Sequence, residues 1–194
     1  MEVLSYPNPV LMRKCTPVAV INQRLRDLVS EMLRTMYEFR GVGLAANQVG
    51  YPLQLFVMNE TGDIEKPEYE HVLINPIIKK RKGILVDEEG CLSFPGIYAD
   101  VNRSEFIEIE SIAIDGSIQR FKWKERPARI AQHEYDHLQG ICFVDRLQEL
   151  NLQEINTKLE ELKINYENNV KQGLMPSDEE TQKFIAELEK QFCE

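Results

Sequence analysis

The sequence predicts an α+β domain with a helical extension at its C-terminus. Three observations support this class: an amphipathic segment at residues 22–40, short apolar runs within residues 54–123, and a second helical segment that ends near Gly140. This order is typical of helices packed on an antiparallel sheet. The 194 residues, of which 43% are hydrophobic, are enough for one ordinary core.

The first element is a helix at residues 22–40. Its apolar side chains recur three and four positions apart, which places them on one face. Asn22 can cap the first turn and Gly41 can end the last one. We expect the following apolar side chains to pack in the core: Leu25, Leu28, Val29, Met32, Leu33 and Met36.

Strands are predicted within residues 54–123. Leu55–Met58 and two runs within residues 72–78 are short and apolar, while Phe106–Glu110 alternates between apolar and polar side chains. The Asp115-Gly116 pair lies between two apolar segments and is typical of a hairpin turn. The middle of the chain is therefore predicted to be mostly antiparallel sheet.

A second helix is predicted from near Pro127, a residue favoured at the first helical position, to Gly140. Beyond it, apolar residues keep a helical spacing that breaks at residues 173–176. Residues 151–194 carry five lysines and ten acidic residues, a net charge of −5. We therefore divide the chain into a main domain at residues 1–150 and an acidic helical extension at residues 151–194.

Composition argues against several classes of protein. No apolar run reaches the roughly 18 residues of a membrane span, and residues 1–10 lack the features of a secretory signal. The net charge of −9 argues against a broad nucleic-acid-binding face and against direct DNA binding. We expect a reduced, cytoplasmic protein, because its four cysteines suggest no disulfide framework: Cys15, Cys91, Cys142 and Cys193.

Two of the three histidines lie four positions apart, in the segment His133-Glu134-Tyr135-Asp136-His137. On a helix both imidazoles then share a face and can share a metal, and Glu134 can reach a water on that metal. A chance pair of histidines has the same pattern. A catalytic site also needs a third protein ligand, and no histidine follows His137, although Glu149 and Glu154 are formally available.

Cys91 is the better candidate for the third ligand. It lies in Glu89-Gly90-Cys91-Leu92-Ser93, between small and flexible residues, which is an unusual setting for a core cysteine. A thiolate here would complete a Cys-His-His site, and the alternative is a buried thiol. A further segment, Gly41–Gln48, has two glycines that allow close backbone approach to a ligand, although a helix cap and a turn would have the same pattern.

Taken together, these segments resemble the peptide deformylase family. That family carries G-x-G-L-A-A-x-Q, E-G-C-L-S and Q-H-E-x-D-H-L-x-G, and the sequence agrees with all three, at Gly41–Gln48, Glu89–Ser93 and Gln132–Gly140. The layout of residues 1–147 is also similar. The resemblance implies antiparallel sheets packed around a central helix that carries the H-E-x-x-H motif, with residues 1–150 as the catalytic domain.

The resemblance implies a hydrolase that removes the N-formyl group from the N-terminal methionine of newly synthesised proteins and releases formate. It implies one divalent metal, ferrous iron, which the ligands alone do not distinguish from zinc, nickel or cobalt. The implied residues are Cys91, His133 and His137 as metal ligands, Glu134 as general acid and base, and the Gln48 side chain and Leu92 N–H as oxyanion donors.

The resemblance also implies that a formyl-methionyl nascent peptide binds as an added strand. Its backbone partners would lie at Gly43-Leu44 and Pro95-Gly96, beside Gly90. The methionine side chain needs an apolar pocket, for which Val42 and Ile130 are candidates.

Several neighbours are candidates for supporting roles. Asp136 could orient a histidine ligand or be a solvated helix carboxylate. Glu89 and Arg103 are expected to form an ion pair that pins the cysteine loop. Arg129 replaces an aliphatic residue of other members, and its stem could line a pocket. Tyr98 stands where some members have arginine, which puts an arginine contact to the substrate in doubt.

The acidic extension departs from bacterial members, in which a basic C-terminal helix is thought to dock on the ribosome. The resemblance implies ribosome proximity, but the charge of residues 151–194 argues against strong docking on ribosomal RNA. Its apolar stripes could pack on the domain or form a dimer. Two other functions stay open: a zinc peptidase with a downstream acidic ligand, and a non-catalytic metal-binding protein.

Overall fold

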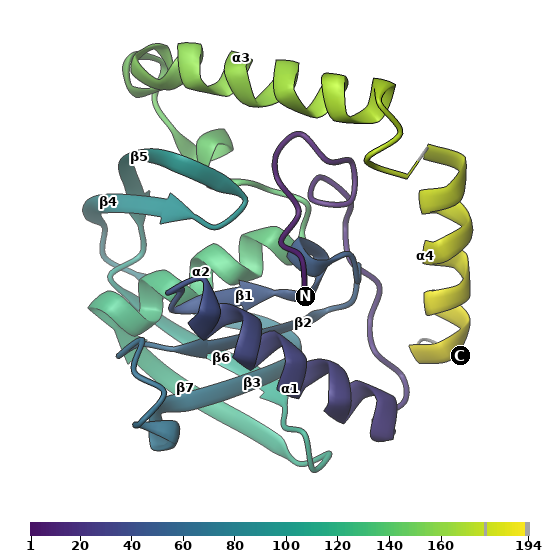
Figure 1. Ribbon diagram of the computed structural model, residues 1–194. Coiled ribbons are helices and arrows are strands. Elements are labelled where there is room, and N and C mark those ends of the chain that lie inside the picture. Colours follow the sequence, from purple (N-terminus) through teal and green to yellow (C-terminus); the bar gives the residue numbers. More distant parts are fainter. Residues whose placement is uncertain (177, 193–194) are drawn as a thin grey trace.

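The computed structural model describes residues 1–176 and 178–192, and its elements follow in the order helix, strands, helix and C-terminal helices (Figure 1). The α+β prediction is therefore confirmed. No helix within these two ranges is long and apolar enough to cross a membrane. Cys193 lies outside the described residues.

Helix α1, Gln23–Glu38, begins where the sequence predicted, and the Asn22 side chain accepts a hydrogen bond from the first turn at 3.0 Å. The left-handed residue that follows the helix is Arg40 (φ 57°), not the glycine after it. Gly41 N–H then donates to the Met36 carbonyl at 2.8 Å, which closes the helix end. After this turn the chain continues directly into strand β1.

Five antiparallel strands form the larger sheet, in the order β1-β2-β3-β6-β7. β3 spans both apolar runs that the sequence kept separate, and it is bulged near Asn75 (φ 50°). β6 and β7 form the predicted hairpin around Asp115-Gly116. The bounds are β1 Gly43–Ala45, β2 Leu55–Asn59, β3 Glu70–Lys82, β6 Phe106–Ile112 and β7 Ile118–Lys124.

A separate two-stranded sheet consists of β4, Leu85–Cys91, and β5, Phe94–Arg103. The pattern of residues 85–103 did not distinguish this hairpin from the larger sheet. Short 3₁₀ helices connect the other elements: η1 Ala46–Val49, η2 Pro67–Tyr69 and η3 Phe143–Arg146.

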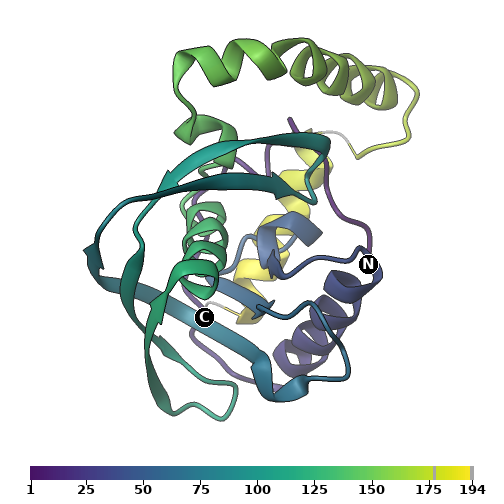
Figure 2. The same cartoon turned by 90° about the vertical axis from the view of Figure 1, so that its left-hand side faces the viewer.

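Helix α2, Glu125–Leu138, lies between the two sheets (Figure 2). It starts at Glu125, close to the predicted start, and Pro127 is the third helical residue and not the first. Lys124 offers no capping side chain, and Glu125 enters the helix with φ 54°, so the usual start signals are missing. The middle of α2 is buried on nearly all sides, including His133, Glu134 and His137.

Helix α3, Glu149–Lys171, runs beside the smaller sheet (Figure 1). It buries Ile155 and Leu159 in a cluster that contains Phe94 of β5. The helix begins before the predicted boundary at residue 150, so that boundary falls in its first turn.

Helix α4, Asp178–Phe192, packs on the other side of the domain (Figure 1). It buries Leu188 and Phe192 in the cluster that contains the apolar face of α1. The Phe192 carbonyl also accepts a hydrogen bond from Ala19 N at 2.8 Å. Buried apolar side chains of both α3 and α4 therefore pack on the domain.

Candidate active site

The three predicted metal ligands meet between α2 and the end of β4. One ligand atom from each of Cys91, His133 and His137 lies within 4.8 Å of the others, and Cys91 Sγ is 3.3 Å from His137 Nε2. One helical turn separates the two histidines, so both imidazoles face the cysteine. In the described ranges no carboxylate joins this group, and the downstream ligands Glu149 and Glu154 of the peptidase alternative are therefore ruled out.

Glu89, two residues before the cysteine, fixes the orientation of His133. Its Oε2 lies 2.9 Å from His133 Nδ1, which leaves Nε2 for the ligand cluster. The carboxylate also accepts hydrogen bonds from Arg103 Nε and Nη2, both at 2.9 Å, so the predicted ion pair is confirmed. Burial alone would raise the pKa of Glu89, but the hydrogen bonds from His133 and Arg103 hold this pKa well below its usual range.

Arg129 is a further partner of Glu89 that the sequence did not predict. Arg129 is among the residues that line the cleft. Its Nη1 donates to Glu89 Oε1 at 2.7 Å and to the Val101 carbonyl at 2.9 Å, while Nη2 donates to the Leu85 carbonyl at 2.6 Å. One guanidinium thus connects α2 to both strands of the smaller sheet. The sequence did contain a signal for this contact. Arg129 and His133 are four positions apart and therefore share one helix face, so both can reach the same carboxylate.

Within the described structure Asp136 makes no hydrogen bond to either histidine, and it is buried, so neither alternative for it, an orienting role or a solvated carboxylate, is correct. Its buried carboxylate bonds to Arg103 and accepts from Arg146 Nη2 at 2.6 Å. His137 Nδ1 is left without a hydrogen-bond partner in the described part of the chain. Burial and the nearby positive charge of His133 lower the pKa of His137 well below its ordinary value, which favours the neutral ring that binds metals.

Gln48 lies buried in η1 with its amide directed at the cluster. Its Oε1 accepts a hydrogen bond from Ala45 N at 2.8 Å. Its Nε2 is therefore turned toward Cys91 Sγ, at 3.4 Å, and Ser93 Oγ, at 3.2 Å. Leu92 follows the cysteine and lines the same cleft, so the two predicted oxyanion donors flank Cys91.

The Glu134 carboxylate is buried against strand β1. A Cβ added at Gly43 would lie 2.8 Å from Glu134 Cδ, so only glycine leaves room for this carboxylate. Glu134 Oε2 has no hydrogen-bond partner among the described residues. Burial raises the pKa of Glu134 to about 7, against the opposing effects of His133 and Arg103. A carboxyl group that titrates near neutral pH is suited to taking up and returning a proton.

A cleft of about 890 Å³ leads to this cluster. The Leu44 side chain does not line it, because it is fully buried in the core that contains α1; the prediction for Leu44 concerned its backbone and stays a prediction. β1 is nevertheless an edge strand of the larger sheet. The other predicted substrate residues all line the cleft: Val42, Gly43, Gly90, Pro95, Gly96 and Ile130.

The donor set fits a divalent transition metal. One thiolate and two imidazoles are the protein ligands of known catalytic metal sites, which keep a further position for water. The hydrogen bond that His133 Nδ1–H donates to the Glu89 carboxylate is the supporting contact expected for a histidine ligand. The two histidines are buried while the cysteine is only half-buried, so the cluster opens toward the cleft.

Comparison with known proteins identifies the family. A sequence profile of the polypeptide deformylase family matches residues 1–153. The chain belongs to the peptide deformylase family. Peptide deformylases are metal-dependent hydrolases that remove the N-formyl group from the N-terminal methionine of newly synthesised proteins, so the family predicted from the three motifs is confirmed.

Individual peptide deformylases agree in sequence and in structure. The enzyme of Rhodopirellula baltica is 40% identical over 173 residues, which cover 89% of this chain and 85% of that protein. A mutant of Arabidopsis thaliana peptide deformylase 1B superimposes with a TM-score of 0.84 and 41% identity, over 92% of this chain and 96% of that one. Plasmodium falciparum peptide deformylase gives a TM-score of 0.84 and 35% identity, over 86% and 98% of the two chains.

Proposed function

We propose that the chain deformylates nascent peptides with a divalent metal held by Cys91, His133 and His137. The meeting of these three ligand atoms within 4.8 Å of one another supports this assignment. When bound, the ion supplies Lewis acidity, which lowers the pKa of a water from 15.7 toward about 7. We propose ferrous iron as the native metal, with zinc, nickel or cobalt as other occupants. Metal analysis of anaerobically purified protein tests this choice, and activity indifferent to air and iron would count against it.

Glu134 is the general acid and base of the proposed reaction. Its buried carboxylate lies beside the two histidines and has an oxygen free of hydrogen bonds within the described structure. It takes a proton from the attacking water and returns it to the nitrogen of the leaving amine. Since its pKa is about 7, both steps are accessible near neutral pH.

Gln48 and Leu92 stabilise the negative charge that develops on the formyl oxygen. The Gln48 amide is held by Ala45 N–H, so its Nε2 already faces the reacting centre and needs no reorganisation. The Leu92 N–H follows the cysteine directly in sequence. Donors of this kind typically contribute about 3–4 kcal/mol each to transition-state stabilisation.

The substrate peptide pairs with the free edge of β1. Edge strands offer unpaired N–H and C=O groups, and Gly43 on this strand lines the cleft. Pro95-Gly96 and Gly90 border the opposite side, and Leu44 contributes through its backbone alone. Val42 and Ile130 form the apolar wall for the methionine side chain.

The division of the chain into a catalytic domain at residues 1–150 and an acidic extension at residues 151–194 is also a proposal. Since the apolar faces of α3 and α4 pack on the domain, we expect the extension to stabilise the fold. Its acidic character argues against docking on ribosomal RNA through these helices. The cytoplasmic location stays a prediction, because a relative from Arabidopsis thaliana is chloroplastic or mitochondrial.

The decisive experiment measures formate release from formyl-Met-Ala-Ser by the anaerobically purified, metal-loaded enzyme. We expect release by the native chain, and Glu134→Gln should keep the metal but lose nearly all turnover. An active, metal-replete Glu134→Gln would refute the role of Glu134. Metal retention by Cys91→Ala would refute the ligand assignment.

A further inference from the structure

The outer face of strands β3, β6 and β7 carries a dense group of cationic side chains. Inward-facing residues of β6, such as Ile107 and Ile109, are buried, so the alternate positions point away from α2. The register between strands places basic residues of β3 and β7 on this outer side. We call them the basic sheet face: Lys79, Lys80, Lys82, Arg120, Lys122 and Lys124.

Acidic residues neutralise only part of the basic sheet face. Glu110 pairs with Lys79 at 3.4 Å and with Arg120 at 2.7 Å, and Glu108 lies 3.9 Å from Lys80. The other three lysines have no carboxylate within ion-pair distance among the described residues: Lys82, Lys122 and Lys124. With Glu105 included, six basic side chains stand against three acidic ones, a local net charge of +3 on a chain of −9.

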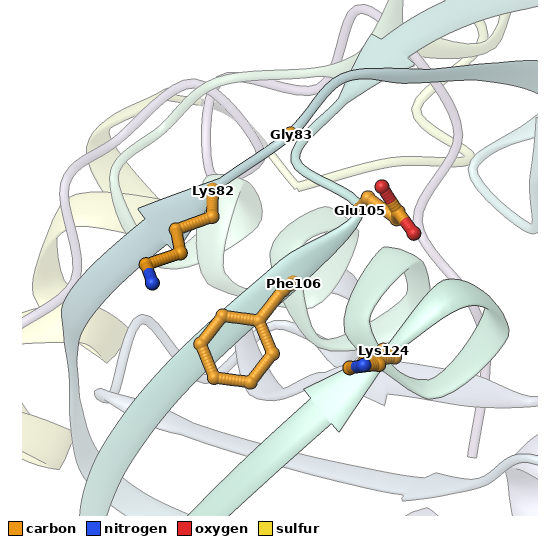
Figure 3. Close-up of a pocket in the computed structure, with 5 residues that line it drawn as sticks. All are labelled: Lys82, Gly83, Glu105, Phe106 and Lys124. Atoms are coloured by element: carbon orange, nitrogen blue, oxygen red, sulfur yellow. The ribbon is translucent and has the colours of Figure 1, made fainter.

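A small pocket of about 290 Å³ lies at one end of this face (Figure 3). Figure 3 shows the Phe106 ring between the side chains of Lys82 and Lys124, with Glu105 at the rim. The strand register explains this arrangement, since Phe106 is the cross-strand neighbour of both lysines. A half-buried aromatic ring between two ammonium groups offers one surface for stacking and two positions for phosphates.

We propose that the basic sheet face binds RNA, with phosphates at Lys82, Lys122 and Lys124 and a base stacked on Phe106. Charge complementarity supports a polyanion, and the half-buried Phe106 ring favours a nucleic acid over a lipid surface, because every base has a face that can stack. The acidic helices α3 and α4 lie away from β7 and do not cover this face (Figure 1). The net charge of −9 argued against a broad nucleic-acid-binding face. That value is a sum over the whole chain, so it does not exclude a local patch of positive charge.

The proposal fits the reaction without depending on it. The substrates are newly synthesised proteins, which emerge from a particle rich in RNA. A weak, salt-dependent contact through the basic sheet face would hold the enzyme near these substrates. The active-site cleft would stay accessible, because it lies beside β1, at the opposite edge of the sheet from β7. Three phosphate contacts to a single strand predict a salt dependence of log K with a slope of about −2.

The test measures binding of a fluorescently labelled oligouridine to the metal-loaded full chain by anisotropy, at low and at physiological salt. The triple variant Lys82→Gln, Lys122→Gln, Lys124→Gln should lose about tenfold or more in affinity at low salt, together with most of the salt slope. The matched control is Lys163→Gln, Lys171→Gln, Lys183→Gln, which removes the same charge from lysines paired with glutamates on α3 and α4. This control should change affinity less than about twofold if the site is local.

A second variant separates stacking from charge. Phe106→Leu should weaken oligouridine binding about fivefold or more but leave the binding of inorganic polyphosphate unchanged. Formate release from formyl-Met-Ala-Ser should be the same in all these variants, so a failure of the proposed catalytic site would be seen separately. If the triple variant loses activity, Lys122→Gln alone should still reduce the salt slope by about 0.7.

Three results would overturn the proposal. Equal losses in the sheet and tail triple variants would show that only net charge matters. Tighter binding to phosphatidylserine vesicles than to RNA would make the partner a membrane. An unchanged salt slope in Lys122→Gln would remove this lysine from the site.

Discussion

The Glu134 carboxylate lies directly against the backbone of Gly43, where a Cβ would stand 2.8 Å from Glu134 Cδ. This contact joins the proposed general base on α2 to the strand proposed to bind the substrate. The Glu134 carboxylate therefore has room only because Gly43 has no side chain.

Gly43→Ala should lower kcat by about 100-fold. The added methyl group would displace the Glu134 carboxylate, which then loses its alignment with the reacting water. Steady-state formate release gives kcat, and thermal unfolding shows whether the fold persists. Gly41→Ala is the control, since its Cβ would lie 3.0 Å from the flexible end of Leu92 and 3.3 and 3.4 Å from the carbonyl oxygens of Met36 and Gly43, with no close contact to Glu134. Equal losses in both variants would contradict the close-approach explanation.

Glu89→Ala should reduce metal affinity by about 10–100-fold, because His133 loses the partner that fixes its ring. It should also lower the free energy of unfolding by about 3–5 kcal/mol, because Arg103 and Arg129 are left buried without their shared carboxylate. Metal content after dialysis and urea unfolding measure the two effects. Glu88→Ala, an exposed neighbour, should leave both quantities nearly unchanged.

The same carboxylate should make stability sensitive to acid. The folded-state pKa of Glu89 is depressed, so its contribution is complete above the unfolded value of about 4.3 and is lost as the pH falls toward the folded-state pKa. The metal-free protein should lose up to about 1.4 kcal/mol per pH unit in that range from this group. Glu89→Gln should show a flatter decline in urea-unfolding free energy with acid. Parallel curves for the two proteins would argue against Glu89 as the source.

Leu188→Ala and Phe192→Ala should each lower the free energy of unfolding by about 2–5 kcal/mol, because both side chains of α4 are buried in the main core. Phe184→Ala on the same helix should cost much less, since 45% of that side chain is exposed. Chemical denaturation compares the three. If all three variants matched the native chain, α4 would be an appendage and not part of the domain.

Regular patterns in the sequence predicted much of the fold. The helical period placed His133 and His137 on one face of α2, and alternation predicted the β6–β7 hairpin. Hydrophobic patterns did not separate the smaller sheet from the larger one, because its inner side is polar where it meets α2. Glu89 and Arg103 occupy buried positions there that a hydrophobic pattern would assign to solvent.

The partners of charged residues were harder to predict than the ligands. Asp136 lies next to His137 in sequence, yet its partners are two arginines from β5 and η3. Such contacts depend on how strands and helices pack, and local spacing does not encode them. The ligand set was accessible because the two motifs that carry it, Glu89–Ser93 and Gln132–Gly140, are each continuous in sequence.

If the substrate pairs with β1 as we propose, the short length of this strand limits how many substrate residues the enzyme contacts. Three residues of extended backbone span about 10 Å. A client protein therefore needs to expose only a short unfolded stretch behind its first residue, whatever its later fold. Once that stretch is packed into a finished domain, it can no longer lie along this edge. Deformylation of each protein must then occur before its own N-terminal segment folds.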